Sequence, residues 1–160
     1  MGNDHDICVL NGLTMTTLDS MKGFEDAAED LKDIAYAAMF ADFAQDRGQV
    51  AAILQAKVRE LHGESGKSAS VLAAAHRNII NTERPFAGKN DNVIIAEVER
   101  GENYITARFE EALMDKALQL TTITAIEKGF AFVKADQDQA SALKRSKRSP
   151  FRRERHTHRI

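Results

Sequence analysis

Apolar residues recur at helical spacing along four long stretches of this 160-residue chain, and little interrupts them. Helix-favouring residue types fill these stretches, and the only prolines are Pro85 and Pro150. No apolar run approaches the roughly 18 residues that a membrane-spanning helix needs, so we expect no membrane insertion. The pattern therefore predicts an all-α fold with a single sizeable core, which the chain length allows.

The lengths of the connections indicate how the expected helices are arranged. Long helices are expected at about Asp6–Leu31, Asp33–His62, Asp91–Met114 and Lys116–Lys144, and a short helix from Ser68 to just before Pro85. Asp33 is the expected cap of the second long helix, and Asp91 or Asn92 that of the third. Short turns make the first two and the last two long helices antiparallel hairpins, whereas about 28 residues separate the middle two. We therefore predict a ferritin-like four-helix bundle with a short extra helix in the long crossover.

Four polar side chains fall on the apolar faces when successive residues are placed about 100° apart around each helix. They are Arg47, Glu102, Gln137 and, in the short helix, His76. A guanidinium can satisfy a carboxylate through two parallel hydrogen bonds, which is the least costly way to bury either group. The sequence therefore predicts a buried ion pair between Arg47 and Glu102, with Gln137 and His76 completing its hydrogen bonds.

Two glycines stand next to this predicted pair, Gly48 beside Arg47 and Gly101 beside Glu102. A glycine inside a helix costs about 1 kcal/mol relative to alanine. We therefore expect both glycines to mark places where neighbouring helices approach closely.

A dinuclear metal site is the alternative interpretation of the polar core. Such a site in a helical bundle takes one Glu from each of two helices and a Glu-x-x-His motif from each of the other two. Glu25 or Glu29 and Glu99 or Glu102 supply the single glutamates, but both Glu-x-x-His motifs are missing. The charge of Arg47 would also repel a dication. We therefore expect no cofactor and keep iron binding through these four glutamates as the alternative.

The sequence offers no catalytic residues. It contains no Ser/His/Asp constellation, glycine-rich phosphate loop or His-Glu-x-x-His motif. Its single cysteine, Cys8, excludes an intramolecular disulfide and fits the reducing cytoplasm. The chain is therefore expected to be a cytoplasmic protein without catalysis.

Charge divides the chain into an acidic body and a basic end. Residues 144–160 carry eight Lys or Arg against one Glu, a balance of +7, whereas residues 1–143 have a balance of −9. We expect a bundle over residues 1–145 and a disordered basic tail over residues 146–160. The segment Lys144–Ile160 is a candidate for binding nucleic acid or an anionic surface, with a simply solvated tail as the alternative.

Aromatic side chains beside the expected core leave homo-oligomerisation open. Tyr36, Tyr104 and Phe132 flank the apolar faces, where they could form a dimer seam or lie half exposed.

Four segments of the chain resemble a known family. They are LNGLTMTTLDSMKGFEDAAEDLKD, FADFAQDRGQVAAILQAKVRELHGE, VLAAAHRNI and IIAEVERGENYITARFEEAL, and the resemblance extends over roughly Val9–Arg145. The family is the bacterial ferritin-like four-helix-bundle family of unknown function, domain-of-unknown-function family 2383. The resemblance implies the ferritin-like fold and no established reaction. The general association of ferritin-like proteins with stress suggests a stress-associated structural or interaction role.

The chain departs from that family at two positions and at its end. Val98 stands where the family commonly has a cysteine, and Gln137 where it commonly has a histidine. Members also usually stop soon after the last helix, whereas this chain continues into the basic segment. Both lost side chains weaken the case for a metal or redox role.

Overall fold

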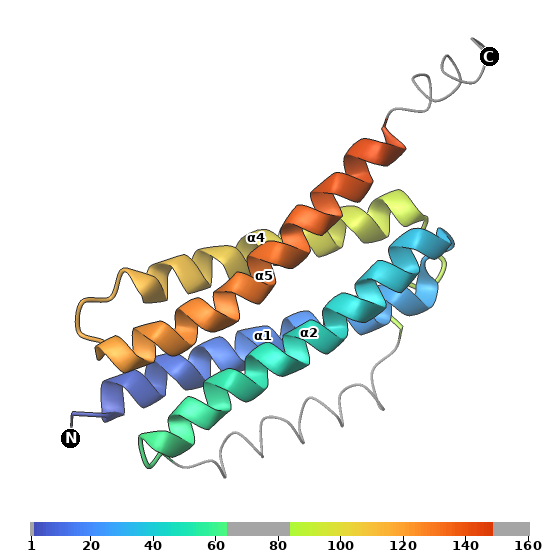
Figure 1. The fold of residues 1–160 in the computed structure, drawn as a ribbon. Helices are drawn as coiled ribbons and strands as arrows, with labels where there is room; N and C mark the ends of the chain where they lie inside the picture. The colour runs from blue at the N-terminus through green and yellow to red at the C-terminus, as the bar shows by residue number, and fades with distance from the viewer. Residues whose placement is uncertain (1, 64–83, 149–160) are drawn as a thin grey trace, which may run out of the picture.

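The computed structural model describes residues 2–63 and 84–148. These residues form an all-α four-helix bundle of α1 (Asp4–Asp30), α2 (Ile34–Glu60), α4 (Asp91–Leu113) and α5 (Leu120–Lys147), as Figure 1 shows. The four expected long helices are thereby confirmed. The short helix expected from Ser68, with His76, and the tail after Arg148 lie outside the described residues.

The helix ends follow local hydrogen bonding. Asp33 caps α2 as predicted, because its carboxylate accepts from the backbone N–H groups of Ala35 and Tyr36. The cap predicted for α4 is wrong: Asn90 accepts from Val93 N–H instead. The last helix begins at Leu120 rather than near Lys116 and runs past Lys144 to Lys147.

The carboxylate of Asp91 has a different role from the predicted cap. Its two oxygens accept hydrogen bonds from the backbone N–H groups of Lys32 and Asp33, each at 2.9 Å. The start of α4 is therefore fastened to the turn between α1 and α2. In Figure 1, α1 and α5 run in one direction and α2 and α4 in the other. The chain thus leaves α2 at one end of the bundle and re-enters α4 at the opposite end.

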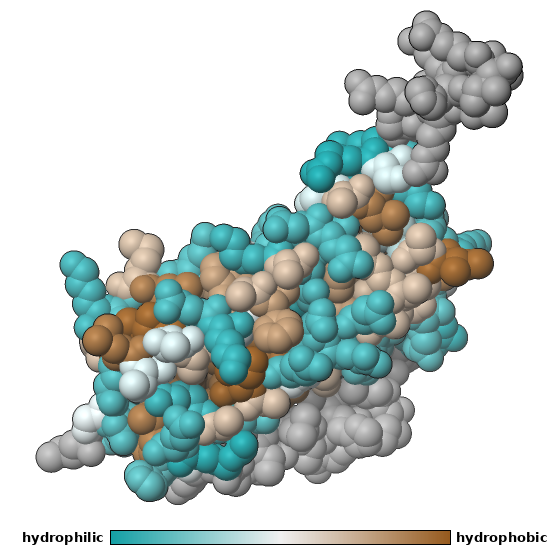
Figure 2. All heavy atoms as spheres, in the orientation of Figure 1, coloured by the Kyte–Doolittle hydropathy of each residue, from teal (hydrophilic) through white to brown (hydrophobic). Residues whose placement is uncertain are grey.

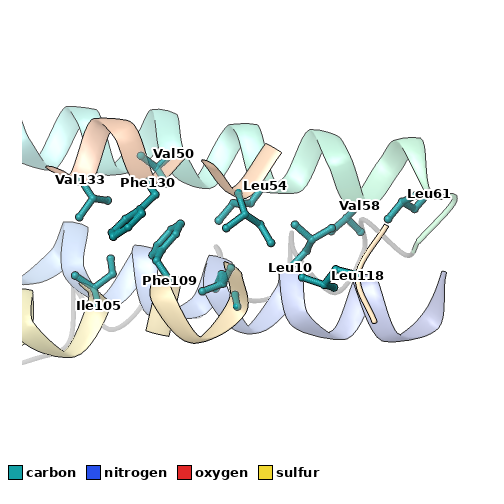
Figure 3. Packing of buried hydrophobic residues seen from close by; sticks show 13 residues of the cluster. Leu10, Val50, Leu54, Val58, Leu61, Ile105, Phe109, Leu118, Phe130 and Val133 are labelled. Atoms are coloured by element: carbon teal, nitrogen blue, oxygen red, sulfur yellow. The ribbon is translucent and has the colours of Figure 1, made fainter. Parts of the chain in front are cut away.

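One half of the bundle, which we call the closed half, is packed by fully buried side chains from all four described helices. Figure 3 shows this cluster, in which the rings of Phe109 and Phe130 stack with centroids 5.4 Å apart. A Cβ added at Gly129 would lie 3.1 Å from Val50 Cγ1, so α5 and α2 approach closely there. The buried members of the cluster are Leu10, Leu13, Val50, Leu54, Val58, Leu61, Ile105, Phe109, Ala112, Leu118, Ile126, Phe130 and Val133.

The other half, which we call the open half, has a second cluster with an aromatic centre. Phe24 makes edge-on contacts with Phe40 and Phe43 at centroid distances of 5.2 and 5.4 Å. Its buried members come from α1, the α1–α2 turn, α2 and α4, whereas α5 contributes only the partly buried Ala140 and Leu143. The buried members are Phe24, Ala27, Leu31, Tyr36, Met39, Phe40, Phe43, Ala44 and Ile94.

The glycines beside the predicted ion pair do not mark close helix contacts. A Cβ at Gly101 would meet nothing within 4 Å, and one at Gly48 would make an ordinary 3.6 Å contact with Met21 Sδ. The prediction of close approach is therefore wrong for both glycines. Among the glycines of the described helices, the tightest approach is at Gly129, which periodicity alone does not distinguish from the others.

Surface apolar groups are scattered. Figure 2 shows a face covered mainly by hydrophilic residues, through which hydrophobic residues emerge in separate patches. Of the three aromatic residues considered for a dimer seam, Tyr36 is buried, Phe132 packs partly buried against the closed half, and Tyr104 is 59% exposed. No helix within the described segments combines the length and the apolar character needed to cross a bilayer.

Candidate functional site

Arg47 lies at the centre of the bundle with 0% of its surface exposed. Its Nη1 donates to Glu102 Oε1 at 2.6 Å, and its Nη2 donates to Glu102 Oε2 at 2.7 Å. Two parallel bonds of this length form the bidentate pair that best compensates the desolvation of both charges. The predicted buried ion pair between α2 and α4 is confirmed.

The other two described helices also contribute to this pair. Ser20 of α1 accepts a second hydrogen bond from Arg47 Nη1 at 2.6 Å. From α5, Gln137 Nε2 donates to Glu102 Oε2 at 3.3 Å and to Thr106 Oγ1 at 2.6 Å. Gln137 therefore reaches Glu102 as expected, whereas the position of His76 is outside the described residues. All four described helices meet in one polar network.

The guanidinium also packs on an aromatic ring. The Cζ atom of Arg47 lies 5.0 Å from the ring centroid of Phe24, within the range of a cation–π contact. Phe24 belongs to the aromatic cluster of the open half. The network is thus placed between the two apolar clusters and joined to one of them by its own cation.

Asp136 is a member of the network that the sequence analysis missed. It is only 4% exposed, and its Oδ2 lies 3.8 Å from Arg47 Nε, which is an ion-pair distance but too long for a hydrogen bond. Burial raises the pKa of Asp136 to about 8, with a further contribution from neighbouring Asp46, against the lowering effect of Arg47. The sequence could have indicated that Asp136 is buried, because it follows Val133 by three residues and so lies on the inner face of α5.

A second buried carboxylate, Asp6, was also missed, and it belongs to the closed end of the bundle. Its Oδ2 accepts from Thr122 Oγ1 at 2.6 Å and from the backbone N–H of Gln119 at 3.1 Å. These bonds fasten the first turn of α1 to the start of α5. The spacing of four residues to Leu10 could have placed Asp6 on the buried face.

The four glutamates of the metal alternative lie in three different settings. Glu25 and Glu29 line a groove between α1 and α2, together with Gly48 and Ala44. Glu99 accepts from Lys144 Nζ at 2.9 and 3.1 Å on the surface of α4 and α5, and Glu102 accepts from Arg47. Across residues 2–63 and 84–148, no group of three or more His, Cys, Asp or Glu side chains is arranged to hold a metal ion.

Two grooves flank α4 in the open half and give access to the network. The groove between α1 and α4 has a volume of about 260 Å³, and Gly23, Phe24, Gly101 and Glu102 are among its lining residues. The groove on the α5 side has a volume of about 280 Å³ and includes Phe24, Glu102 and Gln137. Glu102 therefore borders both grooves while it is bonded to Arg47.

The basic end of the chain is partly neutralised where it leaves the bundle. Lys144 pairs with Glu99, and Lys147 pairs with Asp33 at 3.0 Å. The pairing with Lys147 lowers the pKa of Asp33, as do the hydrogen bonds from Tyr36 and Ala35. The first two lysines of the candidate binding segment thus serve the bundle itself, and the residues after Arg148 lie outside the described part.

The fold and the polar network together define a four-helix bundle whose centre is occupied by an arginine–carboxylate pair. Comparison with protein families matches residues 6–115 to the family described as Domain of unknown function (DUF2383). The chain belongs to this family. No curated protein matches it. The matched region contains Arg47 and Glu102 but ends before α5, which supplies Asp136 and Gln137.

Proposed function

We propose that this protein is a non-catalytic, ferritin-like cytoplasmic bundle with a structural or interaction role, in which Arg47 occupies the place that a metal ion takes in metal-loading bundles. The observation that carries the proposal is the bidentate Arg47–Glu102 pair, formed by a guanidinium with 0% exposure. A cation built into the chain neutralises the central carboxylate permanently. The interior charge is then balanced without a cofactor.

The course of the chain supports the ferritin-like assignment. The two middle helices, α2 and α4, run in the same direction, so a single long connection must join opposite ends of the bundle. One long crossover between two antiparallel hairpins is the arrangement of ferritin-like folds. An up-and-down bundle would instead alternate the helix directions.

The surroundings of Arg47 support the absence of a metal. A dication placed beside Glu102 would lie next to a guanidinium in a poorly solvated interior, where like charges repel strongly. Gln137 also donates to Glu102, so this carboxylate already accepts three hydrogen bonds from side chains. The grooves on either side of α4 then offer surfaces for contact with partners rather than space for a reaction.

The test is metal analysis of untagged protein before and after incubation with ferrous iron under anaerobic conditions, followed by desalting. We expect no stoichiometric iron in the wild type. Glu102→Ala removes the central carboxylate, and Glu110→Ala is its matched control, because Glu110 is exposed on the same helix and is not one of the four candidate ligands. Iron retained at one or more equivalents by the wild type and by Glu110→Ala, but lost in Glu102→Ala, would overturn the proposal in favour of the iron-binding alternative.

A further inference from the structure

Asp136 is a buried acid whose hydrogen bonding is incomplete. Its Oδ2 is buried without any hydrogen-bond partner, and so is Nε of Arg47, although the two atoms are only 3.8 Å apart. The remaining guanidinium nitrogens are already bonded to Glu102 and Ser20. Arg47 therefore compensates a negative charge on Asp136 only incompletely.

Asp46 provides a second carboxyl group for Asp136. It precedes Arg47 on α2, it is half-buried, and its side chain lies within hydrogen-bonding reach of Asp136. Two carboxyl groups this close in a poorly solvated place cannot both be ionised without strong repulsion, and they are best accommodated by sharing one proton. Because Asp46 is half-buried, the proton has a route to solvent.

We propose that Asp46 and Asp136 hold one proton between them inside the bundle, and that release of this proton to solvent frees Asp136 to pair with Nε of Arg47. In the protonated state Asp136 donates its hydroxyl to Asp46. In the ionised state the O–H bond is broken, the two carboxylates repel each other, and the unused Nε–H of Arg47 is the available donor. The contact between α5 and α2 therefore has two forms that pH selects.

The charges around Asp136 support this arrangement and give its pH range. Burial and Asp46 raise the pKa of Asp136 to about 8, Glu102 of α4 adds to the rise, and Arg47 opposes it. From α1 the network receives only the uncharged hydroxyl of Ser20. The folded protein thus binds a proton that the unfolded chain has already lost above pH 4, so folding is favoured less as pH rises from about 4 to 8.

The first test compares Asp136→Asn with wild type by chemical denaturation between pH 5 and 9.5. Asparagine keeps the shape and donates to Asp46 without a proton to lose. The folding equilibrium constant of the variant, divided by that of wild type, should rise about tenfold per pH unit and level off above about pH 8. Asp138→Asn removes the same charge from an exposed position on α5, and its ratio should stay flat. A flat ratio for Asp136→Asn would overturn the proposal.

The second test does not depend on the stability of a variant. Carboxyl carbon NMR of wild-type protein, in buffer with a chelator, should show Asp136 titrating near pH 8. In Asp46→Asn that titration should move to lower pH, because the repelling charge is gone. Titration of Asp136 near its ordinary value of about 4, or an unchanged midpoint in Asp46→Asn, would contradict a shared proton. A midpoint that depends on the chelator would show that a cation holds the two carboxylates.

Discussion

Within the described residues, the closed half receives fully buried side chains from all four helices, whereas the open half receives them from the first three helices and the turn between α1 and α2. The polar network stands where these halves meet. In the closed half, α5 is held by Phe130 and Val133, and by the close approach of Gly129 to Val50. In the open half, α5 contributes Ala140 and Leu143 from a partly buried position.

The comparison shows why charged groups gather at this level of the bundle. Where apolar packing is complete, burial of a charge without bonding partners would cost free energy. Where α5 leaves the core, grooves form beside α4, and Glu102 borders both grooves while it is bonded to the buried Arg47. The network therefore does in the middle of the bundle what Phe109 and Phe130 do in the closed half: it joins α5 to the other helices.

The largest effect expected from this comparison is that of breaking the central pair. Glu102→Ala leaves Arg47 buried without its counter-charge and should lower the free energy of unfolding by about 3–5 kcal/mol. The double variant Arg47→Met with Glu102→Leu replaces the pair by apolar groups and should recover most of this loss. Chemical denaturation measures both. Glu99→Ala, which breaks an exposed pair on the same helix, should cost about 1 kcal/mol or less.

A double variant as unstable as Glu102→Ala would contradict this expectation. It would show that the junction of the two halves requires the charged pair and that apolar packing cannot replace it.

A pair of leucines compares the packing of the two halves directly. Leu54 is 0% exposed in the closed half, so Leu54→Ala should lower the free energy of unfolding by about 2–5 kcal/mol through lost burial and a residual cavity. Leu143 is only partly buried in the open half, and the same truncation should cost distinctly less. Thermal and chemical denaturation of the two variants test the difference. Equal losses would mean that the two halves are packed equally well at these positions.

The smallest expected effects concern two glycines. Gly101 lines the groove between α1 and α4, and a Cβ there would meet nothing within 4 Å. Gly101→Ala should therefore stabilise the protein by about 0.5–1 kcal/mol through helix propensity alone. Gly129→Ala gains the same propensity but places its methyl group 3.1 Å from Val50 Cγ1, so we expect a net loss of stability. Melting temperatures that change in the same direction for both variants would contradict this.

The arrangement of the helices was accessible to sequence reasoning because it follows from periodicity and connection length. The apolar stripes placed Arg47 and Glu102 near the middle of opposing helices, and the pair formed as the geometry required. The cap of α2 was equally accessible, since Asp33 stands directly before the apolar pattern. These features depend on residues close in sequence or on one dominant charge pairing.

The rest of the site depends on how the helices are rotated against one another. The sequence places both Asp136 and Gln137 near the inner face of α5, and only tertiary packing sends the first towards Arg47 and the second towards Glu102. The contact of Asp91 with the α1–α2 turn joins residues about 58 positions apart, which no local pattern reports. The free space beside Gly101 has the same origin, because the groove there is lined by residues of both α1 and α4.

The family match ends before the helix that carries Asp136 and Gln137. The first three described helices supply Arg47 with its bonded Glu102 and Ser20, and the fourth adds the acid Asp136 and the amide Gln137. Exchanging α5 alone would change the acid and the amide of the interior while the residues Arg47, Glu102 and Ser20 are kept. The network is thus divided between the first three described helices and the last one. A chimera that exchanges residues 120–147 would be the direct way to use this division.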